Sequence, residues 1–299
     1  MRIIGNDPST PRQAQIVASG TLSTGDTVVV NSDGTVSVVA SSGGSPAFGT
    51  ATVFEAASAP FIATGFDSNS NRIVIAYTDA GNSNNGTAVV GQVSGTSLAF
   101  GTPVVFSTGY PVETAITFDS NLNKIVIAYS DNSNSEQGLA IVGTVDPADN
   151  SISFGTAAVF NTGIVGAKGC VFDSNSNKVV ISYRLANSTG YSNVGTVSGT
   201  GISFGSAVGF NTGGGNIGST FSVSSVFDST NNKVVIAYRG PGNDGTAIVG
   251  TVSGTSISFG TYVAYTGNVA NYNKIVFDSN SNKVAIFYQD ASNSGYGTG

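Results

Sequence analysis

Acidic side chains recur at one position of this sequence, two residues after the tyrosine that closes an apolar, strand-like run. The three aspartates are Asp79, Asp131 and Asp290. Hydrolysis of a glycosidic bond needs two carboxyl groups that converge on one substrate, and aspartates repeated in this way could supply them. In two other copies of the run an arginine follows the tyrosine directly, at Arg184 and Arg239. A ring of mixed charge is therefore predicted, with ordinary solvated loop charges as the simpler interpretation.

A second candidate is the motif FDSNSNKVVISY at residues 172–183, where Asp173, Asn175 and Asn177 alternate as in the first half of a calcium loop. A calcium loop also needs a glycine near position six and a bidentate acid at position twelve. Lys178 takes the sixth position here, no glutamate follows, and a strand begins at once. Because Asp, Ser and Asn close tight turns with their own backbone bonds, the motif predicts a hairpin turn. Asp173 and Lys178 should face each other across it, and no metal or other cofactor is expected.

The composition excludes several other chemistries. Histidine is absent and Cys170 is the only cysteine, which leaves no His-based triad, no zinc site of His and Cys clusters and no intrachain disulfide. Cys170 is expected to be a small buried hydrophobic residue. The net charge of −6, with only 9% charged residues, offers nothing to nucleic acid or to an anionic membrane. The N-terminus lacks the apolar core of a signal peptide, and no apolar run approaches membrane-spanning length.

The elements that carry these residues repeat about every 50 residues, which is typical of propeller blades. Each unit contains four strand signals separated by Gly, Asn and Ser clusters. The second strand reads IVIAY, IVIAY, VVISY, VVIAY and VAIFY, which is apolar on both faces and therefore predicts burial on both sides. An all-β propeller of four-stranded blades meets that requirement. The five repeats begin at Phe66, Phe118, Phe172, Phe227 and Phe277.

The number of blades depends on the ends of the sequence. The last unit reaches Gly299 after only two strand signals, whereas residues 34–54 resemble strands three and four. We therefore expect five blades at residues 34–299, closed by N-terminal strands as a clasp, with an arm and hairpin at residues 1–33. Two alternatives remain: a longer chain cut at Gly299 with more blades, or a separate hairpin that pairs TVVV with TVSVV around a tight Asp-Gly turn.

Binding is expected on one face of this propeller. In a four-stranded meander, the loops after strands one and three lie on one face, and here they are nearly uniform. The loops after strands two and four lie on the other face and vary in length and content. Variable loops on a rigid scaffold usually carry binding, although neutral drift of inactive loops is the alternative. No catalytic residue is expected, and the candidate binding residues are Asp79, Tyr110, Asp131, Arg184, Tyr191, Phe221, Arg239, Tyr272 and Asp290.

The stretch FDSTNNKVVIAYRGPGNDGTAIVGTVSGTSISFG at residues 227–260 resembles tandem blade repeats in virion structural proteins of marine tailed phages, including cyanophages, which are often described as tail-fibre-like. Looser copies extend the resemblance over roughly residues 34–299. The segment GDTVVVNSDGTVSVV at residues 25–39 also resembles phage structural proteins. The resemblance implies a protein that folds in the host cytoplasm without a signal peptide and then works on the released virion.

The sequence thus predicts a non-enzymatic virion surface protein, like a tail fibre or spike, whose variable loops bind a host surface or glycan. The alternatives are a capsid decoration protein without a receptor role and a glycan-processing enzyme. The expected partners are other virion proteins, reached through the N-terminal arm with Pro8, Pro11 and Arg12, and a host-surface glycan or protein. Nucleic acid and membrane insertion are not expected, and homo-oligomerisation is left open.

Overall fold

The computed structural model describes residues 17–22, 28–38, 48–211 and 223–299, and the chain divides into two units, Met1–Thr50 and Ala51–Gly299. The first unit contains a hairpin of β1 (Val28–Val30) and β2 (Val36–Val38). Its turn uses Gly34 at φ +81°, and the Asp33 carboxylate accepts the Thr35 amide at 2.9 Å. The separate hairpin considered from the sequence is therefore the one that forms.

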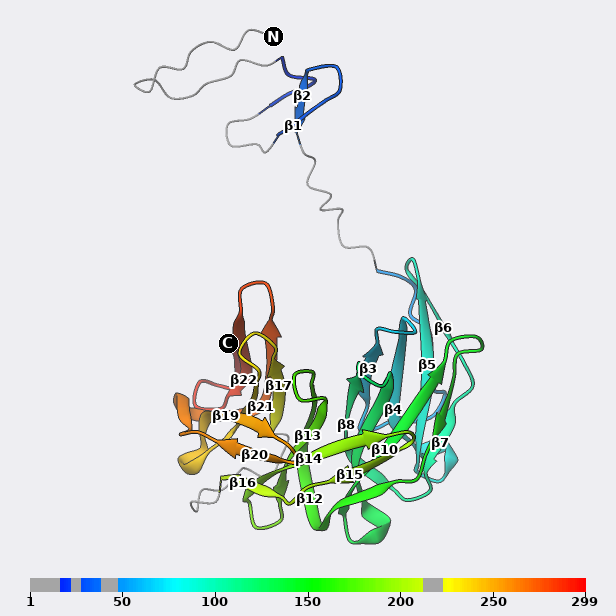
Figure 1. Ribbon diagram of the computed structural model, residues 1–299, viewed down its shortest axis with the longest axis vertical. Coiled ribbons are helices and arrows are strands. Elements are labelled where there is room, and N and C mark those ends of the chain that lie inside the picture. The colour runs from blue at the N-terminus through cyan, green and yellow to red at the C-terminus, as the bar shows by residue number, and fades with distance from the viewer. Residues whose placement is uncertain (1–16, 23–27, 39–47, 212–222) are drawn as a thin grey trace. The chain divides into compact units, whose positions relative to one another are not determined.

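The second unit consists of antiparallel blades that share one plan: three strands in a meander, then a fourth strand broken into two pieces (Figure 1). The first blade contains β3 (Ala63–Asp67), β4 (Arg72–Asp79), β5 (Asn85–Ser94), β6 (Ser97–Phe100) and β7 (Val104–Ser107). The second contains β8 (Pro111–Asp119), β9 (Lys124–Asp131), β10 (Gln137–Asp146), β11 (Ser151–Phe154) and the first half of β12 (Ala158–Asp173). The third contains the rest of β12, then β13 (Lys178–Leu185), β14 (Gly190–Ser198), β15 (Gly201–Phe204) and β16 (Val208–Asn211).

The fourth blade continues the plan, and the fifth contains its first two strands and the start of a third. The fourth contains β17 (Ser224–Asp228), β18 (Lys233–Arg239), β19 (Asp244–Ser253), β20 (Ser256–Phe259) and the first half of β21 (Val263–Asp278). The fifth contains the rest of β21, then β22 (Lys283–Asp290) and β23 (Tyr296–Thr298). Three short 3-10 turns follow second strands, at Ala80–Asn82, Asn132–Asn134 and Pro241–Asn243. No helix among the described residues has both the length and the apolar character needed to cross a membrane.

The first strands of the blades lie side by side in chain order, β3 next to β8, then β12, β17 and β21. The 16-residue strands β12 and β21 each complete one blade with their first half and open the next with their second. The β-propeller of four-stranded blades predicted from the sequence is thereby confirmed.

The core lies between blades, on both faces of the second strands, as the apolar runs predicted. On β9, Val126, Ile127 and Ala128 are fully buried. An aromatic residue of each fourth strand fastens the next blade: the Phe106 ring centroid lies 5.4 Å from that of Tyr129 and 5.8 Å from that of Phe154. Edge-to-face and tilted ring pairs of this kind stabilise packing beyond the area that they bury.

The fifth blade differs from the expected clasp. Strand β2, which the clasp would have used, pairs with β1. The Gly-Thr pair of β23 instead begins strand three, because Thr298 lies opposite Tyr288 as Thr246 lies opposite Tyr238 in the fourth blade. The third-strand position of the fifth blade, which the clasp was expected to fill, is thus taken by β23, the strand that follows β22 in the sequence. The boundary between units also falls after Thr50 and not after residue 33.

Candidate functional site

The repeated Asp-Ser-Asn motif forms turns. Asp173 is 2% exposed, and its Oδ1 accepts the amides of Asn175 and Ser176 at 2.9 and 3.0 Å. Asp173 and Lys178 lie opposite each other as predicted, but no ion pair joins an aspartate and a lysine of these turns in the described residues. The aspartate instead turns inward to cap its own amides. The described chain contains no group of three or more His, Cys, Asp or Glu side chains suited to a metal.

The three aspartates that follow the second-strand tyrosines also cap turns. Asp79 accepts the Asn82 amide at 3.0 Å, and Asp131 accepts both the amide and the hydroxyl of Ser133. Asp290 accepts the Ser292 amide at 3.0 Å. Each carboxylate caps its own turn, and Asp290 also accepts the Asn268 side-chain amide at 2.7 Å, so the three are engaged separately and not as a catalytic pair.

The other predicted binding residues lie in different environments. The Arg239 guanidinium donates to the side-chain oxygens of Asn243 and Asn271. Tyr191 stacks on Tyr183 with ring centroids 6.5 Å apart, which makes it part of the core. Tyr272 is 50% exposed and has a positive φ of 53°. Phe221 lies outside the described residues, and only Tyr110 and Arg184 line a common pocket.

Cys170 packs against the core cluster between the second and third blades. Burial raises the pKa of its thiol to about 12. The thiol is therefore protonated at neutral pH, as a structural cysteine should be, and the residue packs as a small hydrophobic side chain that is partly buried, whereas full burial was expected.

The pocket that contains Tyr110 and Arg184 is formed by bulges in the inner strands. In β8 the ladder skips from Val112 to Ala115, and in β12 it skips from Gly166 to Gly169. Two residues of the inner strand thus lie opposite one residue of its partner, which is the geometry of a β-bulge. Glu113, inside the first bulge, adopts φ +51°. A bulge re-aims side chains, and here it directs them toward the pocket at this end of the inner strands.

Two adjoining hollows share Phe61 and Glu113, and together we call them the axial pocket. The larger, of about 260 Å³, is lined by Phe61, Tyr110, Val112, Glu113, Asn132, Glu136, Ile164, Val165, Gly166 and Arg184. The smaller, of about 150 Å³, is lined by Phe61, Ile62, Glu113, Thr114, Lys168, Val223 and Lys274. The axial pocket therefore gathers two carboxyl groups, Glu113 and Glu136, with three cationic groups.

An ion pair between a fully buried lysine and a partly exposed glutamate lies in the axial pocket. The Lys168 side chain has no exposed surface, and its Nζ lies 3.6 Å from Oε2 of Glu113. Burial lowers the pKa of Lys168 to about 8, although the charges of Glu113 and Glu136 act in the opposite direction. The loss of hydration is thus the larger effect on this ammonium.

Arg184 and Glu113 both lie beside Gly166. A Cβ atom on Gly166 would lie 2.9 Å from Nη2 of Arg184 and 3.1 Å from Oε2 of Glu113, so the glycine leaves room for both groups. Two buried polar atoms here have no hydrogen-bond partner in the described chain, Oγ1 of Thr114 and Nε of Arg184, whereas Nζ of Lys168 has its ion pair with Glu113. Buried polar groups are rarely left in this state, and their presence around one pocket indicates a place for a polar ligand.

Sequence reasoning missed Glu113, Glu136 and Lys168 because it followed the residues that the repeats share. The informative residues were the charged ones that do not recur at the same place in each repeat. The chain has three glutamates and six lysines. Four of the lysines occupy the repeated turns, and the remaining two, Lys168 and Lys274, both line the axial pocket. Two of the three glutamates line it as well.

No model of a known protein family matches the chain, and no curated protein matches it either. Among solved structures, the sialidase of Trypanosoma rangeli, in complex with the inhibitor DANA, is similar with 12% identity and a TM-score of 0.49, covering 80% of this chain and 44% of that one. An exo-β-1,3-galactanase of Phanerochaete chrysosporium, with β-1,3-galactotriose, is similar with 9% identity and a TM-score of 0.47, covering 83% and 64%. The chain thus spans less than two thirds of either protein, and the likeness concerns the fold alone.

These comparisons correct one expectation from the sequence. The chain was expected to be a non-enzymatic virion surface protein that presents variable loops for binding. The solved structures that it is similar to are enzymes named for their action on glycans, and the variable-loop aspartates cap their own turns. That interpretation is therefore withdrawn.

Proposed function

We propose that the protein hydrolyses glycosidic bonds in the axial pocket, with Glu113 and Glu136 as its two carboxyl groups. The observation that carries the proposal is that two of the chain's three glutamates line one pocket, beside buried and unpartnered polar groups. Glycoside hydrolysis needs two carboxyl groups that flank the scissile bond, one to protonate the leaving oxygen and one to act as nucleophile or base.

The surroundings of the two glutamates differ, which suits them to different parts. The Lys168 ammonium lies 3.6 Å from Oε2 of Glu113, so this carboxyl group has a cation beside it. Glu113 therefore takes the part of nucleophile or base. Glu136 is half-buried in the loop after β9, where its backbone is fixed by bonds from its amide to the Asp131 carbonyl and from the Val165 amide to its own carbonyl. We assign Glu136 the part of proton donor.

The cations and hydroxyls of the pocket then position the substrate. Nε of Arg184 and Oγ1 of Thr114 are buried without partners, so a sugar oxygen that reaches them would satisfy them. Tyr110 and Phe61 offer ring surface in the same hollow. Such a pocket combines an apolar wall with a few placed polar groups, which is the usual composition of a small-molecule site.

The test is to assay the full chain against a panel of aryl glycosides and oligosaccharides, alongside Glu113→Gln and Glu136→Gln. We expect each variant to lose at least about 100-fold in kcat/KM, because each removes a group that acts in the transition state. Glu55→Gln is the matched control. Glu55 is the third glutamate, and its carboxylate bonds Tyr77 and the Ala57 amide away from the pocket. Equal activity in all three variants, or no turnover of any glycoside by the parent chain, would sink the proposal.

A further inference from the structure

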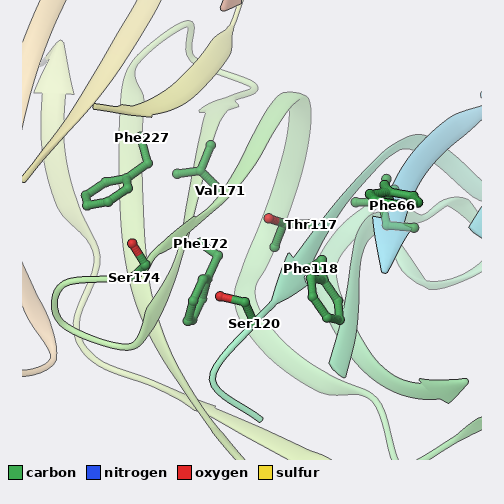
Figure 2. A pocket seen from close by; sticks show the side chains of 10 residues that line it. Phe66, Thr117, Phe118, Ser120, Val171, Phe172, Ser174 and Phe227 are labelled. Atoms are coloured by element: carbon green, nitrogen blue, oxygen red, sulfur yellow. The ribbon is translucent and has the colours of Figure 1, made fainter. Parts of the chain in front are cut away.

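The inner strands form a second pocket at their opposite ends, beside the repeated turns. It has a volume of about 500 Å³. Its walls are four phenylalanines that occupy the same place in successive repeats, each directly before the turn aspartate. Figure 2 shows their rings with the hydroxyls of two serines among them. We call it the phenylalanine pocket, and it is lined by Phe66, Phe118, Phe172, Phe227, Ser120 and Ser174 together with neighbouring strand residues.

No side chain that lines the phenylalanine pocket is ionisable. The carboxylates nearest in sequence are also withdrawn from it. Asp119 and Asp173 are each 2% exposed, and both are occupied by the amides of their own turns. A charged ligand would therefore lose its hydration on binding and form no ion pair in the pocket, which is unfavourable. The pocket selects for an uncharged ligand.

The lining also argues against a purely apolar ligand. Serine hydroxyls lie beside the rings, with Ser120 near Phe118 and Phe172 and Ser174 on the other side of Phe172 (Figure 2). An apolar group would displace water from these hydroxyls and give them no partner. A matching ligand presents C–H bonds to the electron-rich ring faces and hydroxyls to the serines. Uncharged sugars combine these two surfaces on each ring.

We propose that the phenylalanine pocket binds an uncharged oligosaccharide, separately from the axial pocket. Its volume lies in the range of ligand sites, about 300–1,000 Å³. Phe118, Phe172 and Phe227 are held in place because each also packs against a core cluster between blades. The rings are therefore pre-positioned, and binding does not have to order them. This proposal does not depend on hydrolysis at Glu113 and Glu136.

The test uses isothermal titration of the full chain with neutral tri- and tetrasaccharides of gluco, galacto and manno configuration, and with acidic sugars of the same length. The test variant is Phe66→Ala. Phe66 is 53% exposed and belongs to none of the described core clusters, so its removal should spare the fold. The matched control is Phe287→Ala, which removes an equally exposed ring, 52%, that does not line the pocket.

We expect at least one neutral sugar to bind. Its affinity should fall about tenfold in Phe66→Ala, since one ring contact is removed, and should be unchanged in Phe287→Ala. Ser174→Ala should weaken binding as well, because the hydroxyl partner is lost. The proposal is overturned if no neutral sugar binds, if acidic sugars of the same configuration bind more tightly than neutral ones, or if both phenylalanine variants behave alike. Loss of binding in Glu113→Gln, with Phe66→Ala unaffected, would place the sugar in the axial pocket and would also overturn it.

Discussion

The Lys168 ammonium lies 3.6 Å from Oε2 of Glu113, and the lysine side chain is fully buried. The two residues come from bulges in adjacent inner strands, β12 and β8. The ion pair therefore joins two blades at the point where the axial pocket opens. Removing one member of such a pair leaves the other charge buried and uncompensated, so the site and the packing of the blades should respond together.

The buried lysine should make the protein more stable as the pH rises above 8. Burial lowers the pKa of Lys168 from 10.5 to about 8, so between these values the unfolded chain binds more protons than the folded one. The free energy of unfolding then increases with pH, by about 3 kcal/mol at most for a shift of this size. Urea unfolding midpoints measured at pH 7, 8.5 and 9.5 check this.

Lys168→Met should lose this rise between pH 8 and 9.5. Lys274→Met, which removes an exposed lysine of the same pocket, should keep it. The range stops below pH 10 because tyrosines ionise there in the unfolded chain, and the raised pKa of Cys170 opposes part of the rise to the same extent in all three proteins. Burial raises the pKa of Tyr183 to about 12 in the fold, and such tyrosines oppose the trend at higher pH. Parallel profiles for the parent chain and Lys168→Met would contradict the assignment.

Phe106 should matter more to stability than Phe54. Both rings pack against the second-strand tyrosine of a following blade, with centroids 5.4 Å from Tyr129 and 5.3 Å from Tyr77. Phe106 is 7% exposed and lies between two complete blades, whereas Phe54 covers the open face of the first blade. Phe106→Ala should cost about 3–5 kcal/mol and Phe54→Ala about 1–2 kcal/mol. Urea unfolding measures both, and an equal cost would contradict this description of the core.

The Asp-Ser-Asn turns should need their aspartate and no metal. Asp173→Ala removes the acceptor of two amides, those of Asn175 and Ser176, and should cost about 1–3 kcal/mol. Asn175→Ala is the control, because its side chain is exposed and makes no hydrogen bond to the turn among the described residues. Millimolar EDTA or calcium should leave the melting temperature of the parent chain unchanged. A calcium-dependent rise that Asp173→Ala abolishes would restore the metal interpretation.

Strand β22 should exchange its amide hydrogens faster than β18. On the edge that receives strand three, β18 is paired from Val234 to Arg239, whereas β22 is paired there only from Tyr288 to Asp290. Amides without a neighbouring strand exchange through small openings. Hydrogen–deuterium exchange read by mass spectrometry should show at least tenfold faster exchange in residues 284–287 than in residues 234–237. Equal protection would mean that another segment covers this edge.

The sequence was a good guide to the fold because the same physical requirement is repeated in each unit. A run such as VVISY, apolar on both faces, can only be buried between two layers, and residues 179–183 are indeed buried. The clasp was a less secure inference because Gly34-Thr35 and Gly297-Thr298 carry the same local signal. Only the register of Thr298 opposite Tyr288 shows which pair the fifth blade uses.

The site was harder to predict because its residues are brought together by bulges. Glu113 lies six residues before Asp119, inside a segment that reads as a regular strand. Nothing in the local pattern shows that the ladder skips there, or that Lys168 of the next repeat lies beside it. The aspartates that the repeat pattern singles out, such as Asp131, instead accept hydrogen bonds from residues of their own turns. The resemblance to marine phage proteins, and partners reached through residues 1–33, stay predictions.

One position near the start of the inner strands differs in residue type between repeats, although its backbone conformation is the same. Phe61, Glu113 and Tyr272 lie at equivalent positions, six residues before their turn aspartates, and all have a positive φ, between 51° and 56°. An aromatic hydrocarbon, an acid and a phenol therefore occupy equivalent positions with the same backbone conformation. Because the ladder skips this position in β8 and β21, substitutions here do not disturb the register of the repeat. Each such position can thus hold a different side chain without a change of strand register, so single substitutions can alter the lining of the axial pocket one blade at a time.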